Sequence, residues 1–384
     1  MDSNYEKLYV EKTNFFLLIV VLIFQTIDNA FRDNNVAIFG NIKLVILLFT
    51  FVIFSIELFV GHRKILFLKY ESKVVITWYL LLLIISIYWM YKNNTWNTSP
   101  FILGILRILT PVFFAYLVVN LISPDEVYKA MYFFLIISFI VFVCNEVIMG
   151  RFSFREIFSL SLTNSSGSEI ESNFFSPTAF SLCCYFGYFR KNKIPLIISV
   201  IFTILTYKRL MALFAIFLLF FGGMLKNRKV FLWVKILTAF LFFGMTVWYI
   251  KLNLGRIDDN FIYNIFNQSL DKLTMGRTWL FQNIYVQGFP RSGLFSVLNS
   301  IYRSPEMDLP VMFLEMGYFA IIVTIIALLS LIKRKLFGFV IIIFVLLEML
   351  TSHFFDITFF WVVLYILIGY VNNEKNLQAF GNFY

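Results

Sequence analysis

The sequence has little charge, few histidines and few cysteines, and each shortage excludes a class of protein. Charged residues make up 14% of the 384 positions, against about 25% in a typical soluble domain, while hydrophobic residues make up 60%. This balance excludes an ordinary soluble fold. With only two histidines, His62 and His353, and no cluster of carboxylates, we expect neither a metal site nor a cofactor. The three cysteines, Cys144, Cys183 and Cys184, fall inside apolar runs, so we expect no disulfide framework.

Several recognisable motifs are also missing. The sequence contains neither a glycine-rich phosphate-binding loop nor a GxSxG nucleophile motif. Its apolar runs do not alternate polar and apolar residues, which argues against an outer-membrane barrel. No cleavable signal pattern occurs at the start, so we expect Phe15 to Phe24 to belong to a retained first span. The net charge of +10 then indicates membrane topology, and we expect no nucleic-acid partner.

Long apolar runs recur along the whole chain, each bounded by a few charges. This pattern predicts an all-α polytopic protein of about twelve transmembrane helices, forming one integral membrane domain over residues 1–384. We expect the spans near residues 14–31, 43–60, 74–91, 101–122, 127–149, 174–189, 194–207, 210–225, 230–250, 310–332, 336–350 and 357–371.

Lysine and arginine gather in four short loops between these runs. The loops contain HRKILFLKYESK, RKNK, KNRK and KRK, with four, three, three and three cations. Because such loops stay on the cytoplasmic side, we expect both termini to be cytoplasmic. The outer side then receives a medium loop over 150–173 and a large loop over 251–309, between the ninth and tenth helices. Short segments near 32–42, 92–100 and 351–356 are expected on the same side.

The cations Lys208 and Arg209 interrupt a stretch that is otherwise apolar. Two spans in that stretch would have roughly 15 residues each and reach about 23 Å, less than a hydrocarbon core of about 30 Å. We therefore expect a short hairpin whose tip, residues 207–209, lies recessed below the outer surface. The alternative is that the two side chains extend outward to the lipid headgroups.

Two arginines of the large loop suit an anionic ligand. Arg277 follows Gly276 where a helix is expected to begin, and Arg291 follows the turn at residues 288–290. Backbone N–H groups at a helix start, together with a guanidinium, bind phosphate or diphosphate well. Ion pairing within the loop is the alternative for both arginines.

Four candidate residues are acidic or able to exchange protons. Asp308 is either a general base or a helix cap, and Glu315, seven residues later, lies on the same helical face. Either carboxylate is a potential partner for Arg107, which lies inside an apolar run. His353 and Asp356 form either an acid–base pair or a polar turn.

The arrangement of these residues resembles a known family. Lys208 and Arg209 open a short span, Gly276 and Arg277 lie in the large outer loop, and EMD at 306–308 precedes EMG at 315–317. Over about residues 150 to 335 the chain resembles the Wzy-type O-antigen polymerases and the related O-antigen ligases of the bacterial envelope.

Spacings between arginine and glycine add to the resemblance. Polymerases of this family are described with such spacings in the third and fifth outer loops. Here ten residues separate Arg277 from Gly288, and fifteen separate Arg151 from Gly167. In the ligases the helix after the large loop begins with a histidine, whereas Asp308 stands near that place here. This departure favours a polymerase.

The resemblance implies glycosyl transfer at the outer face of the bacterial cytoplasmic (inner) membrane. The substrate would be an undecaprenyl-diphosphate-linked glycan, whose repeat units are polymerised for lipopolysaccharide or another cell-envelope polysaccharide without a metal. Asp308 would be the general base, with Glu315 second. The groups expected to hold the diphosphate are Arg209, Arg277, Arg291 and Lys208. Arg151, Arg107 and His353 are further substrate-binding or structural candidates.

Other functions remain open at this stage. A flippase or another transporter of lipid-linked oligosaccharides would also have many spans and buried cations, although transporters tend to show internal repeats and this sequence shows none. An O-antigen ligase is a further alternative. Membrane lipid is an expected partner, and the sequence leaves open whether a chain-length regulator protein is another.

Overall fold

The computed structural model describes residues 2–33, 38–61, 65–150, 172–190, 192–257, 260–274, 276–289, 291–297, 305–355 and 357–378. This part of the chain is all-helical, and its only strand-like pairing is an isolated bridge between Lys229 and Lys335. Seven of the helices are long and apolar enough to cross a membrane. The prediction of a membrane-embedded helical protein is therefore confirmed. The number of twelve spans and the cytoplasmic position of both termini stay predictions.

The seven long apolar helices include one that is composite, in which a π-helical turn separates two α-helical parts. They are α1 (Asp2–Asp33), α2 (Ile38–Val60), α3 (Lys69–Lys92), the composite α4 (Ser99–Gly104), η1 (Ile105–Leu109) and α5 (Thr110–Leu121), α6 (Pro124–Ile148), α10 (Arg209–Lys226) and α11 (Leu232–Asn253). The shorter apolar helices are α9 (Lys193–Leu205), α17 (Tyr318–Ser330), α18 (Leu336–Thr351) and α19 (Thr358–Asn372). The remaining helices are α8 (Phe175–Tyr188), α12 (Asn260–Phe266), α13 (Leu270–Leu273), α14 (Arg277–Val286), α16 (Asp308–Met316) and α20 (Glu374–Gln378).

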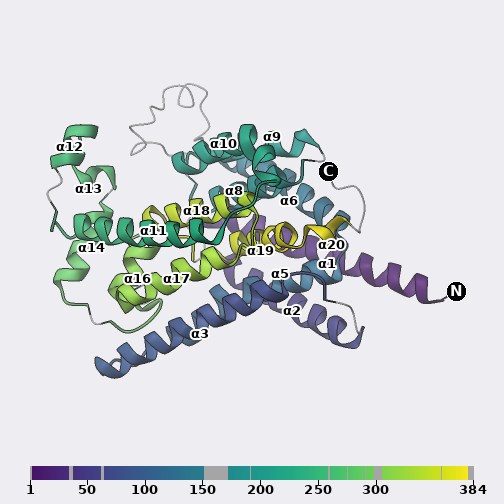
Figure 1. Ribbon diagram of the computed structural model, residues 1–384. Helices are drawn as coiled ribbons and strands as arrows, with labels where there is room; N and C mark the ends of the chain where they lie inside the picture. Colours follow the sequence, from purple (N-terminus) through teal and green to yellow (C-terminus); the bar gives the residue numbers. More distant parts are fainter. Residues whose placement is uncertain are drawn as a thin grey trace. The chain divides into compact units, whose positions relative to one another are not determined.

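The chain divides into two compact units, which are described separately. The first unit comprises Met1–Lys69, Pro111–Arg228 and Phe359–Tyr384. Within it α1 packs against α2 and α6, and α8, α9 and α10 pack against one another (Figure 1). The expected hairpin over Lys208 and Arg209 is present, because α9 ends at Leu205 and α10 begins at Arg209.

The tip of this hairpin is tight. Tyr207 has a left-handed φ of 57°, and Lys208 is the N-cap residue of α10. At 13 residues α9 reaches about 20 Å, which is short of a hydrocarbon core of about 30 Å. With 18 residues, α10 is longer than the roughly 15 expected. The depth of the tip within the membrane stays a prediction.

The second unit comprises Tyr70–Thr110 and Lys229–Thr358. Within it α11 packs against α14, α16 and α17, and α18 packs against α16 and α17 (Figure 1). Among its described residues, the expected large outer loop includes the helices α12, α13 and α14. Residues 151–171, which make up most of the medium loop, lie outside the described part of the chain.

One expected span is wrong as a single helix. The run over 310–332 divides into α16 and α17 at Gly317, whose φ of 80° and ψ of −173° are open to glycine alone. A β-carbon at this position would also lie 3.4 Å from Nη1 of Arg291. The break follows from backbone geometry, which hydropathy does not report.

Candidate functional site

The segment that joins α18 to α19 collects several of the expected site residues, all within the second unit. Asp308, the first residue of α16, directs its carboxylate at this segment. Its Oδ2 accepts the N–H groups of Phe354 at 2.6 Å and Phe355 at 3.0 Å, and its Oδ1 contacts Nδ1 of His353. Its own N–H donates to the Ser352 carbonyl at 3.3 Å. Asp308 thus ties the start of α16 to the turn after α18.

These contacts change the expected role of Asp308. The alternative that its side chain caps α16 is wrong, because Met307 holds the cap position and the carboxylate faces the 352–355 turn instead. Its side chain is 1% exposed, whereas that of His353 is 22% exposed. The pairing of His353 with Asp308 was missed because 45 residues separate them. The expected partner, Asp356, lies outside the described residues.

Arg277 reaches the end of α18, next to this segment, from α14. Its Nη1 donates to the Thr351 carbonyl at 2.8 Å, and its Nη2 pairs with Oε2 of Glu306 at 2.7 Å. Gly276 precedes it with a left-handed φ of 79°, a conformation that glycine adopts without strain. The ion pair within the loop, which was the alternative expected for Arg277, is therefore present. Arg277 and the Asp308–His353 pair both contact residues 351–355, so the structure brings them together.

Glu315 is buried, and each of its carboxylate oxygens accepts a backbone N–H group. Its Oε2 accepts the N–H of Phe295 and its Oε1 accepts the N–H of Val297, both at 3.0 Å. The segment that it holds contains Gly293, where φ is 90° and an added β-carbon would come within 2.8 Å of Ser86. Because both oxygens bind backbone, the geometry assigns Glu315 to the support of this segment and does not favour a role as base.

Arg291 lies between two aromatic rings. Its guanidinium carbon is 4.5 Å from the ring centre of Trp89 and 5.4 Å from that of Phe313. The indole N–H of Trp89 donates to the Met316 carbonyl at 2.7 Å, which fixes one wall of this cage. No carboxylate pairs with Arg291 among the described residues. The ion-pair alternative is therefore not seen here.

Arg107 lies in the π-helical turn η1, with its guanidinium carbon 5.0 Å from the ring centre of Phe295. Among the described residues, the ion pairs do not include the expected pairing of Arg107 with Asp308 or Glu315. Pro111 follows this turn and has no N–H to donate to the Arg107 carbonyl, which accounts for the loosened helix. Such turns occur frequently at functional sites.

Lys208 and Arg209 belong to the first unit, and both side chains are partly buried at the start of α10. Their joint action with Arg277 and Arg291, which belong to the second unit, stays a prediction. Arg151 lies outside the described residues.

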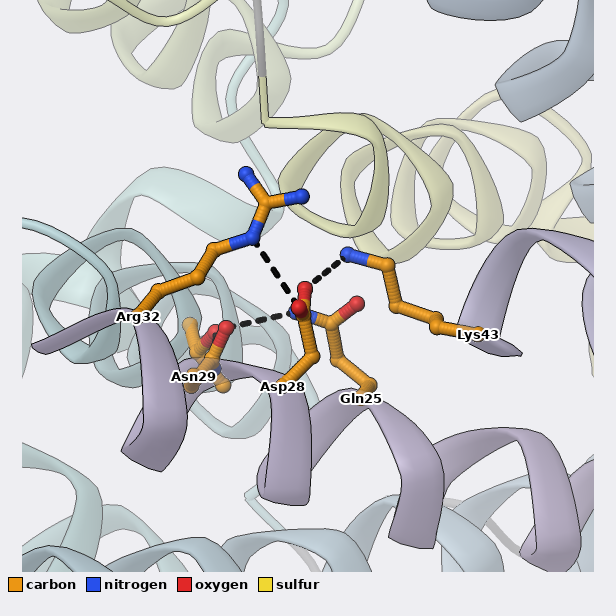
Figure 2. Close-up of polar contacts among 6 residues, drawn as sticks. Gln25, Asp28, Asn29, Arg32 and Lys43 are labelled. Atoms are coloured by element: carbon orange, nitrogen blue, oxygen red, sulfur yellow. Dashed lines mark hydrogen bonds and ion pairs between the residues drawn. The ribbon is translucent and has the colours of Figure 1, made fainter. Parts of the chain in front are cut away.

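A buried polar cluster in the first unit was not anticipated. Figure 2 shows Asp28 between Arg32 and Lys43, with Gln25 and Asn29 beside it. The Arg32 Nε lies 2.9 Å from the Asp28 carboxylate, whose side chain is 1% exposed. No role was expected for Asp28, although its spacing of four residues from Arg32 permits an ion pair on one helical face.

Within the described ranges, no three histidine, cysteine, aspartate or glutamate side chains are placed to hold a metal. Comparisons with family models, with curated proteins and with solved structures find no match to this chain. The chemistry of the site is therefore argued from its own residues.

Proposed function

We propose that the chain is a glycosyltransferase that polymerises undecaprenyl-diphosphate-linked oligosaccharide repeat units at the outer face of the bacterial cytoplasmic membrane. The observation that carries the proposal is the Asp308–His353 pair, placed beside Arg277 on residues 351–355. In the reaction an acceptor hydroxyl oxygen bonds to the anomeric carbon of the donor sugar. The bond from that carbon to the diphosphate oxygen breaks, and the diphosphate leaves with the electron pair. A base takes the hydroxyl proton.

His353 is the group best suited to act as this base. Its Nδ1 faces the Asp308 carboxylate, which orients the ring, leaves Nε2 as the proton acceptor and stabilises the imidazolium that forms. Asp308, proposed as the base from the sequence, becomes a positioning residue in this scheme. The Nε2 atom lies below the protein surface, so an acceptor sugar must displace covering side chains when it binds.

Arg277 and Arg291 supply charge for the leaving diphosphate. Preorganised guanidinium groups stabilise such an anion as its charge develops, and they bind it bidentately. Glu306, the partner of Arg277, is half-exposed, and exposed ion pairs of this kind contribute only about 0–1 kcal/mol. A diphosphate therefore displaces Glu306 at little cost. Arg291 needs no such exchange, because its cage is aromatic. Lys208 and Arg209 are proposed as further diphosphate ligands.

The decisive experiment is turnover of a purified lipid-diphosphate-linked repeat unit by the full chain in vesicles, with products sized on a gel. The wild type should give a ladder. His353→Gln and Arg277→Ala should lose about a hundredfold or more in rate, as expected for loss of a base or of an anion-stabilising donor. Lys272→Gln, an exposed cation in the same loop, is the matched control and should give the wild-type ladder.

Two other outcomes assign a different function. Transfer of a single glycan to a lipid acceptor, with no ladder, indicates a ligase. Movement of the labelled lipid across the bilayer, with no new glycosidic bond, indicates a flippase and removes the catalytic roles given to His353 and Arg277.

A further inference from the structure

An apolar groove runs between α11 and α17, within the second unit. It has a volume of about 620 Å³ and is lined from α11 by residues that recur every three or four positions, from Leu232 to Phe243. This stripe extends for about 16 Å along the helix. Ile322, Ile325 and Leu329 form the opposite wall. Both helices are apolar, so we expect the groove to face the hydrocarbon of the membrane.

Two lysines close one end of this groove. The Lys235 ammonium donates to the carbonyls of Ile332 and Lys333, and no carboxylate pairs with it among the described residues. Lys333 lies 3.6 Å from the Glu71 carboxylate and 5.5 Å from the ring centre of Tyr70, and its side chain is 40% exposed. The closed end therefore carries one cation whose charge no acidic group offsets.

More cations lie at the same end. The Val230 N–H donates to the Arg334 carbonyl at 2.7 Å, which joins the segments carrying Lys229 and Lys335. These segments belong to the basic loops that the sequence places on the cytoplasmic side. Basic pockets at the cytoplasmic ends of transmembrane helices bind anionic headgroups.

A second groove, of about 400 Å³, lies on the other side of α17, against α3. Lys73 contributes to its lining. The two grooves share Tyr70, Ile326 and Ser330, so they meet at the lysine-rich end and diverge along α17. This arrangement suits a headgroup from which two chains extend.

We infer that these grooves form a binding site for a two-chain anionic phospholipid of the surrounding bilayer. Lys235 and Lys333 bind the phosphate, and one acyl chain lies on each side of α17. Charge complementarity selects the anionic headgroup, and the paired grooves select two chains over the single chain of a polyprenyl phosphate. The site is separate from the proposed glycosyl-transfer residues and does not rest on that function.

Native mass spectrometry of the detergent-solubilised full chain tests this inference. The protein is titrated with dioleoyl phosphatidylglycerol and with dioleoyl phosphatidylcholine, which share their chains and differ in headgroup. The wild type should bind the anionic lipid more tightly. Lys235→Gln should weaken that binding about fivefold, and Lys235→Gln with Lys333→Gln about thirtyfold, at roughly 1 kcal/mol for each cation. Neither change should alter phosphatidylcholine binding.

Two further variants keep the test decisive. Lys251→Gln removes a cation at the other end of α11 and should leave both affinities unchanged. Ala239→Trp fills the first groove from a partly exposed position and should weaken both lipids. Lys235→Gln retains the Lys333–Glu71 pair, so lipid binding by this single variant can be measured even if the double variant does not fold. Equal wild-type affinity for the two lipids, or equal effects of Lys235→Gln and Lys251→Gln, would overturn the inference. Displacement of phosphatidylglycerol by equimolar undecaprenyl phosphate would overturn the two-chain assignment.

Discussion

Asp308→Asn separates the structural role of this residue from its role in the proposed chemistry. The asparagine side chain has the same shape, and its oxygen can still accept the N–H groups of Phe354 and Phe355. Its NH₂ group then faces Nδ1 of His353 and must donate to it. The histidine proton moves to Nε2, and the ring can no longer take a proton from an acceptor hydroxyl.

The structure sets the size of both effects. Three hydrogen bonds to a carboxylate become bonds to a neutral amide. Bonds to charged groups contribute about 1.5–3 kcal/mol and neutral ones about 0.5–1.5, so we expect a loss of roughly 3 kcal/mol in the free energy of unfolding. The turnover rate should fall much further, by about 10³–10⁴-fold, because the wrong tautomer predominates.

Both quantities are measurable on one preparation. The temperature at which the protein in detergent loses its monodisperse peak measures stability. The rate of ladder formation below that temperature measures turnover. His353→Gln is the comparison, since it should also lower the rate, by about a hundredfold or more, without removing the bonds to Phe354 and Phe355. A folded Asp308→Asn protein that polymerises within threefold of the wild-type rate would refute the orientation of His353 by Asp308.

Three further changes have defined outcomes. Glu315→Gln places an NH₂ group opposite one of two backbone N–H donors, so the unfolding free energy should fall by about 1–3 kcal/mol. An unchanged melting temperature would contradict the contacts with Phe295 and Val297. Gly317→Ala strains a backbone conformation that only glycine adopts, so the free energy of unfolding should fall by about 1–3 kcal/mol in the same assay. Gly244→Ala is the control, because a β-carbon at Gly244 would lie in open space. Arg291→Lys keeps the charge but loses the planar stacking and the bidentate fork; the KM for the lipid donor should rise about tenfold, and an unchanged KM would exclude Arg291 from the donor site.

The fold was predictable wherever composition determines it. Long apolar runs produced α2, α3, α6 and α11 close to the expected positions, because a hydrocarbon environment requires helices of that length. The hairpin at Lys208 was predictable because two cations interrupt the apolar stretch between two basic clusters that we expect on one side. The break at Gly317 was not, since a continuous apolar run conceals a change in backbone dihedral angles.

The site was predictable as a set of residues but not as a set of contacts. Asp308 and His353 were both candidates, yet nothing in their separate surroundings shows that the 352–355 turn meets the start of α16. The aromatic cage of Arg291 could not be predicted for the same reason, because Trp89 lies about two hundred positions away in the chain. Pairings of this kind depend on packing between distant helices, which local sequence patterns do not report.

The interruption of the chain at Gly317 has an electrostatic consequence. A helix carries roughly half a positive elementary charge at its N-terminus, and α17 begins here, inside an apolar stretch. Arg291 lies at this end, since its Nη1 would be 3.4 Å from a β-carbon on Gly317. Gly317 also ends α16, whose C-terminus carries the opposite partial charge, so the two helix dipoles offset each other at this position. The guanidinium of Arg291 is therefore held mainly by the rings of Trp89 and Phe313 and not by a net helix field.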